Sequence, residues 1–156
     1  MNPYVHAMII SDHYYRDRHT GKSIISGTFS TINSRTFPSS HSNCAVYVAM
    51  SDVATDGKAQ LEYRMEDGSY SMKLPEWEVK KPEDRRAIVE IGGNINGLPL
   101  PKPGVYEFVV LWNGMEISSR RLNVKKVNIE KKGGQEGDPG GGDNPEGQGD
   151  NPEQDA

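Results

Sequence analysis

The sequence predicts an all-β protein built as an antiparallel, two-sheet β-sandwich. Apolar and polar side chains alternate with a period of two along much of the chain. Gly, Asp and Asn residues that favour turns separate these stretches. No window of about a dozen residues has the 3.6-residue period of an amphipathic helix. A chain of 156 residues with this pattern has room for one domain with a substantial core.

We expect about eight strands, a number typical of a sandwich. Several of the apolar stretches are apolar on both faces, or nearly so, and suit central strands. The expected strands span residues 4–10, 22–33, 44–52, 60–65, 70–74, 86–95, 105–112 and 117–124, with a further short one at 77–80.

Two hairpins are marked by their turn residues. An Asp-Gly pair at 67–68 and an Asn-Gly pair at 113–114 each separate two alternating stretches, and both pairs tolerate the positive φ of a tight turn. After the second turn the inward pattern slips by one position between Ile117 and Leu122. We therefore expect a β-bulge near residues 118–121, where an extra residue restores the inward face.

The sandwich is predicted to occupy residues 1–128, and residues 129–156 are predicted to form a disordered acidic tail. From Gly133 onward there are eight Gly and three Pro residues and no large apolar side chain, so nothing there offsets the entropy of ordering the chain. The sequence Gly-Asp-Asn-Pro-Glu occurs at 142–146 and again at 149–153, which indicates low complexity. Seven acids and no Lys or Arg in this segment leave a body of net charge +3, so weak, salt-sensitive contacts between tail and body are expected.

Composition argues against several classes of protein. Cys44 is the only cysteine and the N-terminus lacks the pattern of a signal peptide, so we expect a cytoplasmic protein. No stretch approaches the roughly 18 apolar residues of a membrane helix, and the basic doublets are scattered rather than gathered into a nucleic-acid-binding stripe. Without strand-to-helix turns, the phosphate cradles and nucleophile elbows of α/β enzymes are not expected either.

No motif indicates catalysis, a cofactor or a metal ion. Residues 92–97 have the glycine spacing of a phosphate loop but lack its Lys and hydroxyl residue, and we interpret them as the end of a strand. Cys44, with His41 or His6 as a base, has the composition of a thiolate nucleophile, but its place at the start of an apolar strand favours a small buried side chain.

Residues 12–19 gather four side chains that ligate metals, but Arg16 and Arg18 lie between them and oppose a cation. We expect a polar connection. Two alternatives stay open. A calcium- or glycan-binding sandwich would use the carboxylates, and a hydrolase would need His or Cys side chains in an enclosed pocket. The residues concerned are Asp12, Asp17, Asp52 and Asp56 for the first alternative, and His13, His19 and Cys44 for the second.

The candidate binding residues are Tyr14, Tyr15 and Arg16. Adjacent tyrosines in a polar segment do not both turn into the same core, so we expect at least one to be exposed. An exposed tyrosine next to arginine has the composition of a protein-binding or glycan-binding surface.

Three segments resemble a bacterial family known only as a domain of unknown function, for which a β-sandwich is expected. Met8-Ile-Ile-Ser-Asp12 followed by residues 21–29 is similar to that family's opening strands, and Phe37-Pro38 precedes the strand at Cys44. Residues 100–108, with the Asn-Gly-Met-Glu turn after them, are similar to its Pro-Gly-x-Tyr-x-Phe strand and hairpin. The resemblance implies no activity.

Gly104-Val-Tyr106 in the last of these segments is similar to the tyrosine corner of immunoglobulin-like sandwiches, in which the phenol bonds to backbone across a sheet crossing. We therefore expect an immunoglobulin-like sandwich. With no constellation suited to chemistry, the predicted function is a non-enzymatic, cytoplasmic protein-interaction module with an unidentified protein partner.

Overall fold

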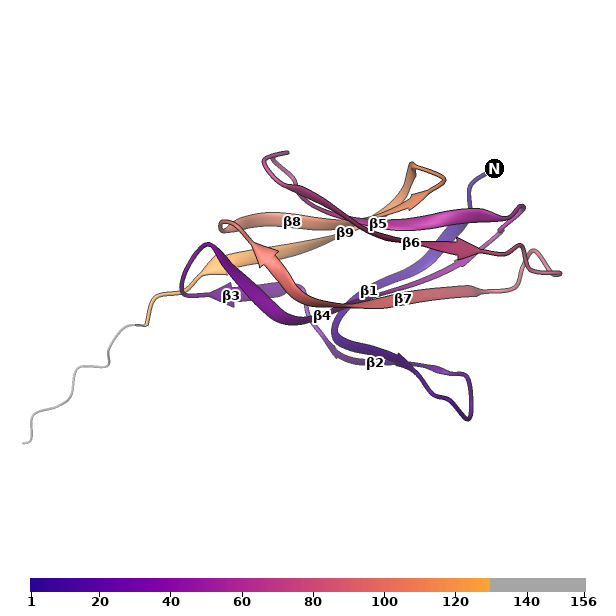
Figure 1. Ribbon diagram of the computed structural model, residues 1–156, viewed down its shortest axis with the longest axis horizontal. Helices are drawn as coiled ribbons and strands as arrows, with labels where there is room; N and C mark the ends of the chain where they lie inside the picture. The colour runs from indigo at the N-terminus through magenta and orange to yellow at the C-terminus, as the bar shows by residue number, and fades with distance from the viewer. Residues whose placement is uncertain (130–156) are drawn as a thin grey trace, which may run out of the picture.

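The computed structural model describes residues 1–129 and is all-β, with two sheets and no helix in this part of the chain (Figure 1). No membrane-spanning helix is therefore found there. The nine strands are β1 (Tyr4–Arg16), β2 (Ser23–Thr28), β3 (Thr31–Ser34), β4 (Ser39–Ser51), β5 (Gly57–Met65), β6 (Ser71–Val79), β7 (Val89–Leu100), β8 (Gly104–Trp112) and β9 (Met115–Lys126).

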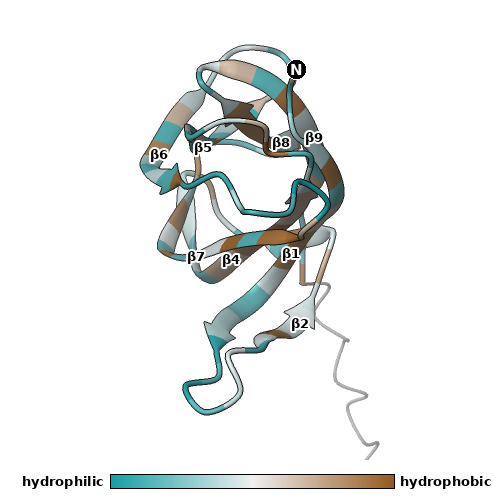
Figure 2. Ribbon diagram, turned by 90° about the vertical axis from the view of Figure 1, so that its right-hand side faces the viewer, coloured by the Kyte–Doolittle hydropathy of each residue, from teal (hydrophilic) through white to brown (hydrophobic). Residues whose placement is uncertain are grey.

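The strands form a four-stranded sheet in the order β2-β1-β4-β7 and a five-stranded sheet in the order β3-β9-β8-β5-β6. All neighbours are antiparallel except β3 and β9, which are parallel. The two sheets face each other, and one of them is curled like half a barrel (Figure 2). The predicted all-β, two-sheet architecture is confirmed.

The core lies between the sheets and is centred on an aromatic group. Tyr63 of β5 stacks on Tyr106 at a centroid distance of 5.1 Å and packs against Phe108 at 5.0 Å. Its hydroxyl donates a hydrogen bond to the carbonyl of Pro99 on β7 at 3.0 Å. One side chain thus fills the core with apolar surface and links the two sheets with a polar bond.

Both predicted hairpins are present. Gly68 has a φ of 74°, and Asn113 and Gly114 have φ values of 48° and 83°, as tight turns require. The predicted bulge also exists, one residue before the expected segment. Val110 pairs with Ser118 while Leu111 pairs with Glu116, so Ile117 is the extra residue.

Several strand predictions were wrong in their extent. The strands expected at 70–74 and 77–80 are one strand, β6, while β4 begins earlier and β7 lies later than expected. The single strand expected at 22–33 is two strands, β2 and β3, which belong to different sheets. Residues 12–16, expected as part of a polar connection, continue β1. Residues 92–97 lie inside β7 rather than at a strand end. In the last two cases polar residues are accommodated because the strand has an exposed face there, which the local composition does not reveal.

The prediction of a disordered tail concerns residues that, apart from Ile129, lie outside the described part of the chain.

The Tyr106 hydroxyl bonds to backbone of the connection that precedes β8. The phenol is fully buried, donates to the carbonyl of Lys102 at 2.7 Å and accepts from the Lys102 N–H at 3.3 Å. This pair of bonds ties the start of β8 to the connection that precedes it.

We predict that Tyr106→Phe lowers the free energy of unfolding by about 1–2 kcal/mol, because the Lys102 carbonyl loses its partner in a partly buried setting. Urea denaturation should show a lower midpoint at an unchanged slope. Tyr4→Phe is the matched control, since Tyr4 is 62% exposed. An equal loss in both variants would contradict a specific role for the corner.

Candidate functional site

The first candidate feature is a two-stranded arm that leaves the sandwich. β1 pairs with β4 only from Tyr4 to Ser11, where Ser11 lies opposite Ala45. Beyond that point β1 continues, paired with β2 alone, to Arg16. We call residues 12–28 the β1–β2 arm. It projects from the body of the protein in both views (Figures 1 and 2).

The two faces of the arm differ. Tyr14 and Ile25, which lie opposite each other, are partly buried and share one face. Tyr15 and Ile24, also opposite each other, share the other face and are 52% and 36% exposed. The alternation of a strand thus places one tyrosine against the body and the other in solvent.

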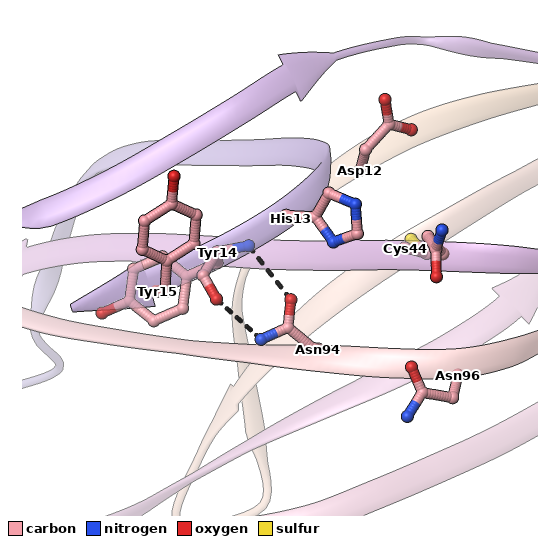
Figure 3. A pocket seen from close by; sticks show the side chains of 8 residues that line it. Asp12, His13, Tyr14, Tyr15, Cys44, Asn94 and Asn96 are labelled. Carbon is pink, nitrogen blue, oxygen red and sulfur yellow. Dashed lines mark hydrogen bonds between the residues drawn. The ribbon is translucent and has the colours of Figure 1, made fainter. Parts of the chain in front are cut away.

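The side chain of Asn94 fastens the arm to β7. Its Oδ1 accepts a hydrogen bond from the Tyr14 N–H at 3.0 Å, and its Nδ2 donates one to the Tyr14 carbonyl at 2.7 Å (Figure 3). An amide side chain carries the same donor and acceptor as a peptide unit. Asn94 therefore takes the part of a neighbouring strand where β4 has separated from β1.

Glycine at position 92 lets the Tyr14 ring lie directly on β7. A Cβ at Gly92 would be 2.6 Å from Cε1 of Tyr14, which is closer than two such atoms can approach. Tyr47, opposite Gly92 on β4, packs against the same ring at a centroid distance of 5.8 Å. Aromatic packing and the Asn94 bonds thus hold the arm at the same place.

Glu90 adds a polar contact on this surface. The Tyr47 hydroxyl donates a hydrogen bond to Glu90, and the Arg16 guanidinium lies 3.5 Å from the second carboxylate oxygen. Burial, followed by the neighbouring Glu90 carboxylate, raises the pKa of Tyr47 to about 12, so the phenol keeps its proton and acts as a donor at neutral pH.

A hollow of about 370 Å³ lies where the arm and the sheet separate (Figure 3). The arm contributes one wall, and β4 and β7 contribute the other. Cys44, at the bottom, is only 1% exposed. The lining residues are Asp12, His13, Tyr14, Tyr15, Asn43, Cys44, Asn94 and Asn96.

The structure places the three predicted binding residues in different roles. Tyr14 is a packing residue of the arm, Arg16 pairs with Glu90, and Tyr15 is exposed. They lie on a strand rather than in the loop that we expected. Their function as binding residues stays a prediction.

The carboxylates of the proposed calcium site do not form a cluster. Asp17 accepts bonds from the backbone of His19 and Thr20, which lower its pKa, and Asp56 accepts bonds from Lys80 and Lys81. Asp17 therefore stabilises a turn, and Asp56 links the start of β5 to the segment that follows β6. Within residues 1–129, no group of three or more His, Cys, Asp or Glu side chains is arranged to hold a metal ion.

The residues proposed for hydrolase chemistry have contrasting environments. Burial, followed by the charge of Asp12, raises the pKa of Cys44 to about 12, so its thiol is protonated at neutral pH. His13 and His19 are exposed, and His41 packs edge to face against Phe29.

Sequence reasoning missed Asn94 and Gly92, which position the arm. A signal for them existed. Glycine inside a stretch that otherwise alternates indicates a place where another segment approaches closely, and Gly92-Gly93-Asn94 lies between the apolar residues Ile91 and Ile95. What the sequence did not reveal is which segment approaches.

A protein-family model described as a family of unknown function (DUF6941) matches residues 6–125. The chain belongs to this family. The match spans all nine strands of the DUF6941 sandwich, with only the ends of β1 and β9 outside it, and agrees with the resemblance inferred from the sequence.

No curated protein matches the chain at a significant level. Among solved structures, the chain is similar to the Pseudomonas fluorescens alkylpurine DNA glycosylase AlkC bound to DNA containing an abasic site analog, with 12% identity and a TM-score of 0.46. The similarity covers 79% of this chain and 30% of that protein. A similarity at this level supports no inference about the function of the DUF6941 domain.

We predict that Asn94→Ala speeds hydrogen exchange of the Tyr14 amide about tenfold, because the loss of two hydrogen bonds makes local opening easier by about 1.4 kcal/mol. NMR-detected exchange measures this directly. Asn96→Ala is the matched control, since Asn96 lies two residues along the same strand and makes no bond to Tyr14 within the described residues. Equal exchange rates in the two variants would refute the fastening role of Asn94.

We also predict that Cys44 of the native protein does not react with a thiol reagent at pH 8, because the thiol is buried and its pKa is about 12. Complete labelling should follow in strong denaturant, where the pKa returns to about 8.5. The absorbance of the chromophore that the thiol reagent releases measures the extent of labelling in the folded and in the denatured protein. Rapid labelling of the folded protein would contradict the buried, protonated thiol.

Proposed function

We propose that this domain is a non-enzymatic protein-interaction module that binds an extended segment of a partner protein along the free edge of β2. The observation that carries the proposal is that β2 is an edge strand with no protective residue. Its sequence, Ser-Ile-Ile-Ser-Gly-Thr, contains neither a charged side chain nor proline. Edge strands without such residues are sites where another strand adds.

The other sheet edges are protected. β6 carries Lys73, Pro75 and two glutamates, and β7 carries Glu90 and Pro99. β3 is only four residues long. Charge, proline and short length are the usual means by which a sheet edge avoids pairing. The contrast with β2 supports a role for the β2 edge in recognition.

The backbone of β2 is oriented to accept a strand. Tyr14 directs both its N–H and its carbonyl to Asn94, away from β2. In an antiparallel pair, opposite residues direct their backbone groups either toward each other or both away. Ile25, opposite Tyr14, therefore directs its N–H and carbonyl to the free edge, where they can bond an incoming strand.

Side chains beside this edge supply apolar contact. Tyr15 and Ile24 form an exposed pair on the outer face of the arm. A partner segment added to β2 would place alternate side chains next to Ile24, so an apolar or aromatic residue at that position would be favoured. Backbone bonds would provide much of the affinity, and this pair would provide selectivity.

We further propose that the sandwich is immunoglobulin-like. The order β9-β8-β5 corresponds to strands G, F and C of that class, and β1-β4-β7 corresponds to A, B and E. The Tyr106 bond to Lys102 supports the same assignment. The single cysteine, Cys44, supports a cytoplasmic location for the module.

The experiment that tests the interaction proposal is site-specific photocrosslinking in the native host. A photoreactive phenylalanine derivative replaces Ile24 in one bait and Met115 in another. Met115 is a matched control because it is 55% exposed and lies at the β8–β9 turn. We expect a protein adduct from position 24 that is absent from position 115, with the crosslinked peptide in an extended segment of the partner.

A proline substitution then tests strand pairing. Ile25→Pro removes the outward N–H, and we expect the adduct yield from position 24 to fall about tenfold. Ser71→Pro, on the β6 edge of the other sheet, should leave the yield unchanged. Thermal melting confirms that both variants are folded. Identical adducts from both positions, or a yield insensitive to Ile25→Pro, would reject the proposal.

A further inference from the structure

The hollow between the arm and the sheet contains polar side chains without protein partners. The carboxylate of Asp12 and the amides of Asn43 and Asn96 line it. Among the described residues, none of these three side chains takes part in a hydrogen bond or an ion pair, whereas Asn94 beside them is fully engaged by Tyr14. All three side chains line the same hollow, where Asn43 and Asn96 are exposed and Asp12 is half-buried.

Strand geometry brings these groups together. Asn43 and Asn96 lie opposite each other on β4 and β7, so their amides are neighbours. Asp12 approaches from the arm, and its carboxylate lies against Gly27, where a Cβ would be 2.3 Å from Oδ2. Figure 3 shows Asp12 and His13 on the arm side of the hollow and Asn94 and Asn96 on the β7 side. The hollow thus has polar groups on both walls.

The chemistry of the lining selects a class of ligand. No Lys or Arg among residues 1–129 lines the hollow, and Asp12 gives it a negative charge, so an anionic ligand is disfavoured. Two amides and a carboxylate require a ligand with several donors and acceptors close together. Neighbouring hydroxyl groups on a sugar ring satisfy this requirement, because each hydroxyl both donates and accepts.

The size of the hollow and its aromatic residue fit the same class. A volume of about 370 Å³ lies at the lower end of the range for small-molecule sites, about 300–1,000 Å³. Tyr15 also lines the hollow and is half exposed, so aromatic surface is present for contact with the C–H groups of a sugar. We propose that the hollow is a binding site for a neutral saccharide unit, with Asp12, Asn43 and Asn96 as its hydrogen-bonding residues.

The test is an NMR titration of the full chain with methyl glycosides of glucose, galactose and mannose. The side-chain amide signals of Asn43 and Asn96 report on the hollow directly. We expect at least one glycoside to give saturable shifts of these signals, with a Kd on the order of 1 mM. The Asn94 amide signal should shift less, because its hydrogen bonds are already formed.

Variants separate specific binding from a general effect of the sugar. We expect Asn96→Leu to weaken binding about tenfold, because one amide contributes bonds to the hydroxyl groups. Asp12→Asn should weaken it as well, while keeping the shape of the wall. Asn123→Leu is the matched control, since Asn123 is an exposed asparagine on β9, a strand of the other sheet.

The Tyr14 amide signal shows whether each variant keeps the arm in place. The proposal would be overturned if none of the three glycosides gave saturable shifts. Shifts that are equally strong in Asn96→Leu, Asp12→Asn and Asn123→Leu would overturn it too, since the sugar would then be bound elsewhere.

Discussion

Strand β4 is buried on both faces, and this constraint organises the rest of the molecule. Every residue from Cys44 to Ser51 is buried. Cys44, Val46 and Val48 face the core and are covered by the five-stranded sheet. Tyr47 faces the other way and is covered by Tyr14 of the arm. A strand that is apolar on both faces needs a layer on each side, and the arm supplies the outer layer beside Tyr47.

This covering role explains why a hollow lies beside the arm and why the β2 edge projects from the body. After Ser11, β1 loses β4 as a backbone partner. Asn94 replaces that partner at Tyr14, and the hollow stays open beside this contact. β2 is the terminal strand of its sheet and follows β1 away from the body. The hollow and the projecting position of the free edge are therefore two results of one departure from regular sheet geometry.

The sequence was sufficient to predict the structural features that depend on residues close together in the chain. Side-chain alternation and the two Gly-containing turns predicted the strands and hairpins, and the slip at Ile117 predicted a bulge. The path of β1 was beyond such reasoning, because residues 12–16 are polar and the contacts that keep them extended come from Gly92 and Asn94, about 80 positions away. The division of residues 22–33 between two sheets likewise depends on β9, which pairs with β3. The candidate site is built mainly from such distant contacts, so the sequence located Tyr14 and Tyr15 but not their surroundings.

An unprotected edge strand is useful for recognition only if its shape is kept before the partner arrives. Ordering a loose two-stranded arm on binding would cost conformational entropy and lower the affinity. The arm avoids this cost because three contacts hold Tyr14 in place. Its backbone bonds to Asn94, and its ring packs on Gly92 and against Tyr47. Arg16 and Glu90 add a further contact near its end. The side chains that cover β4 are thus the same ones that hold the β2 edge in place, so the stability of the core and the proposed recognition surface depend on the same contacts.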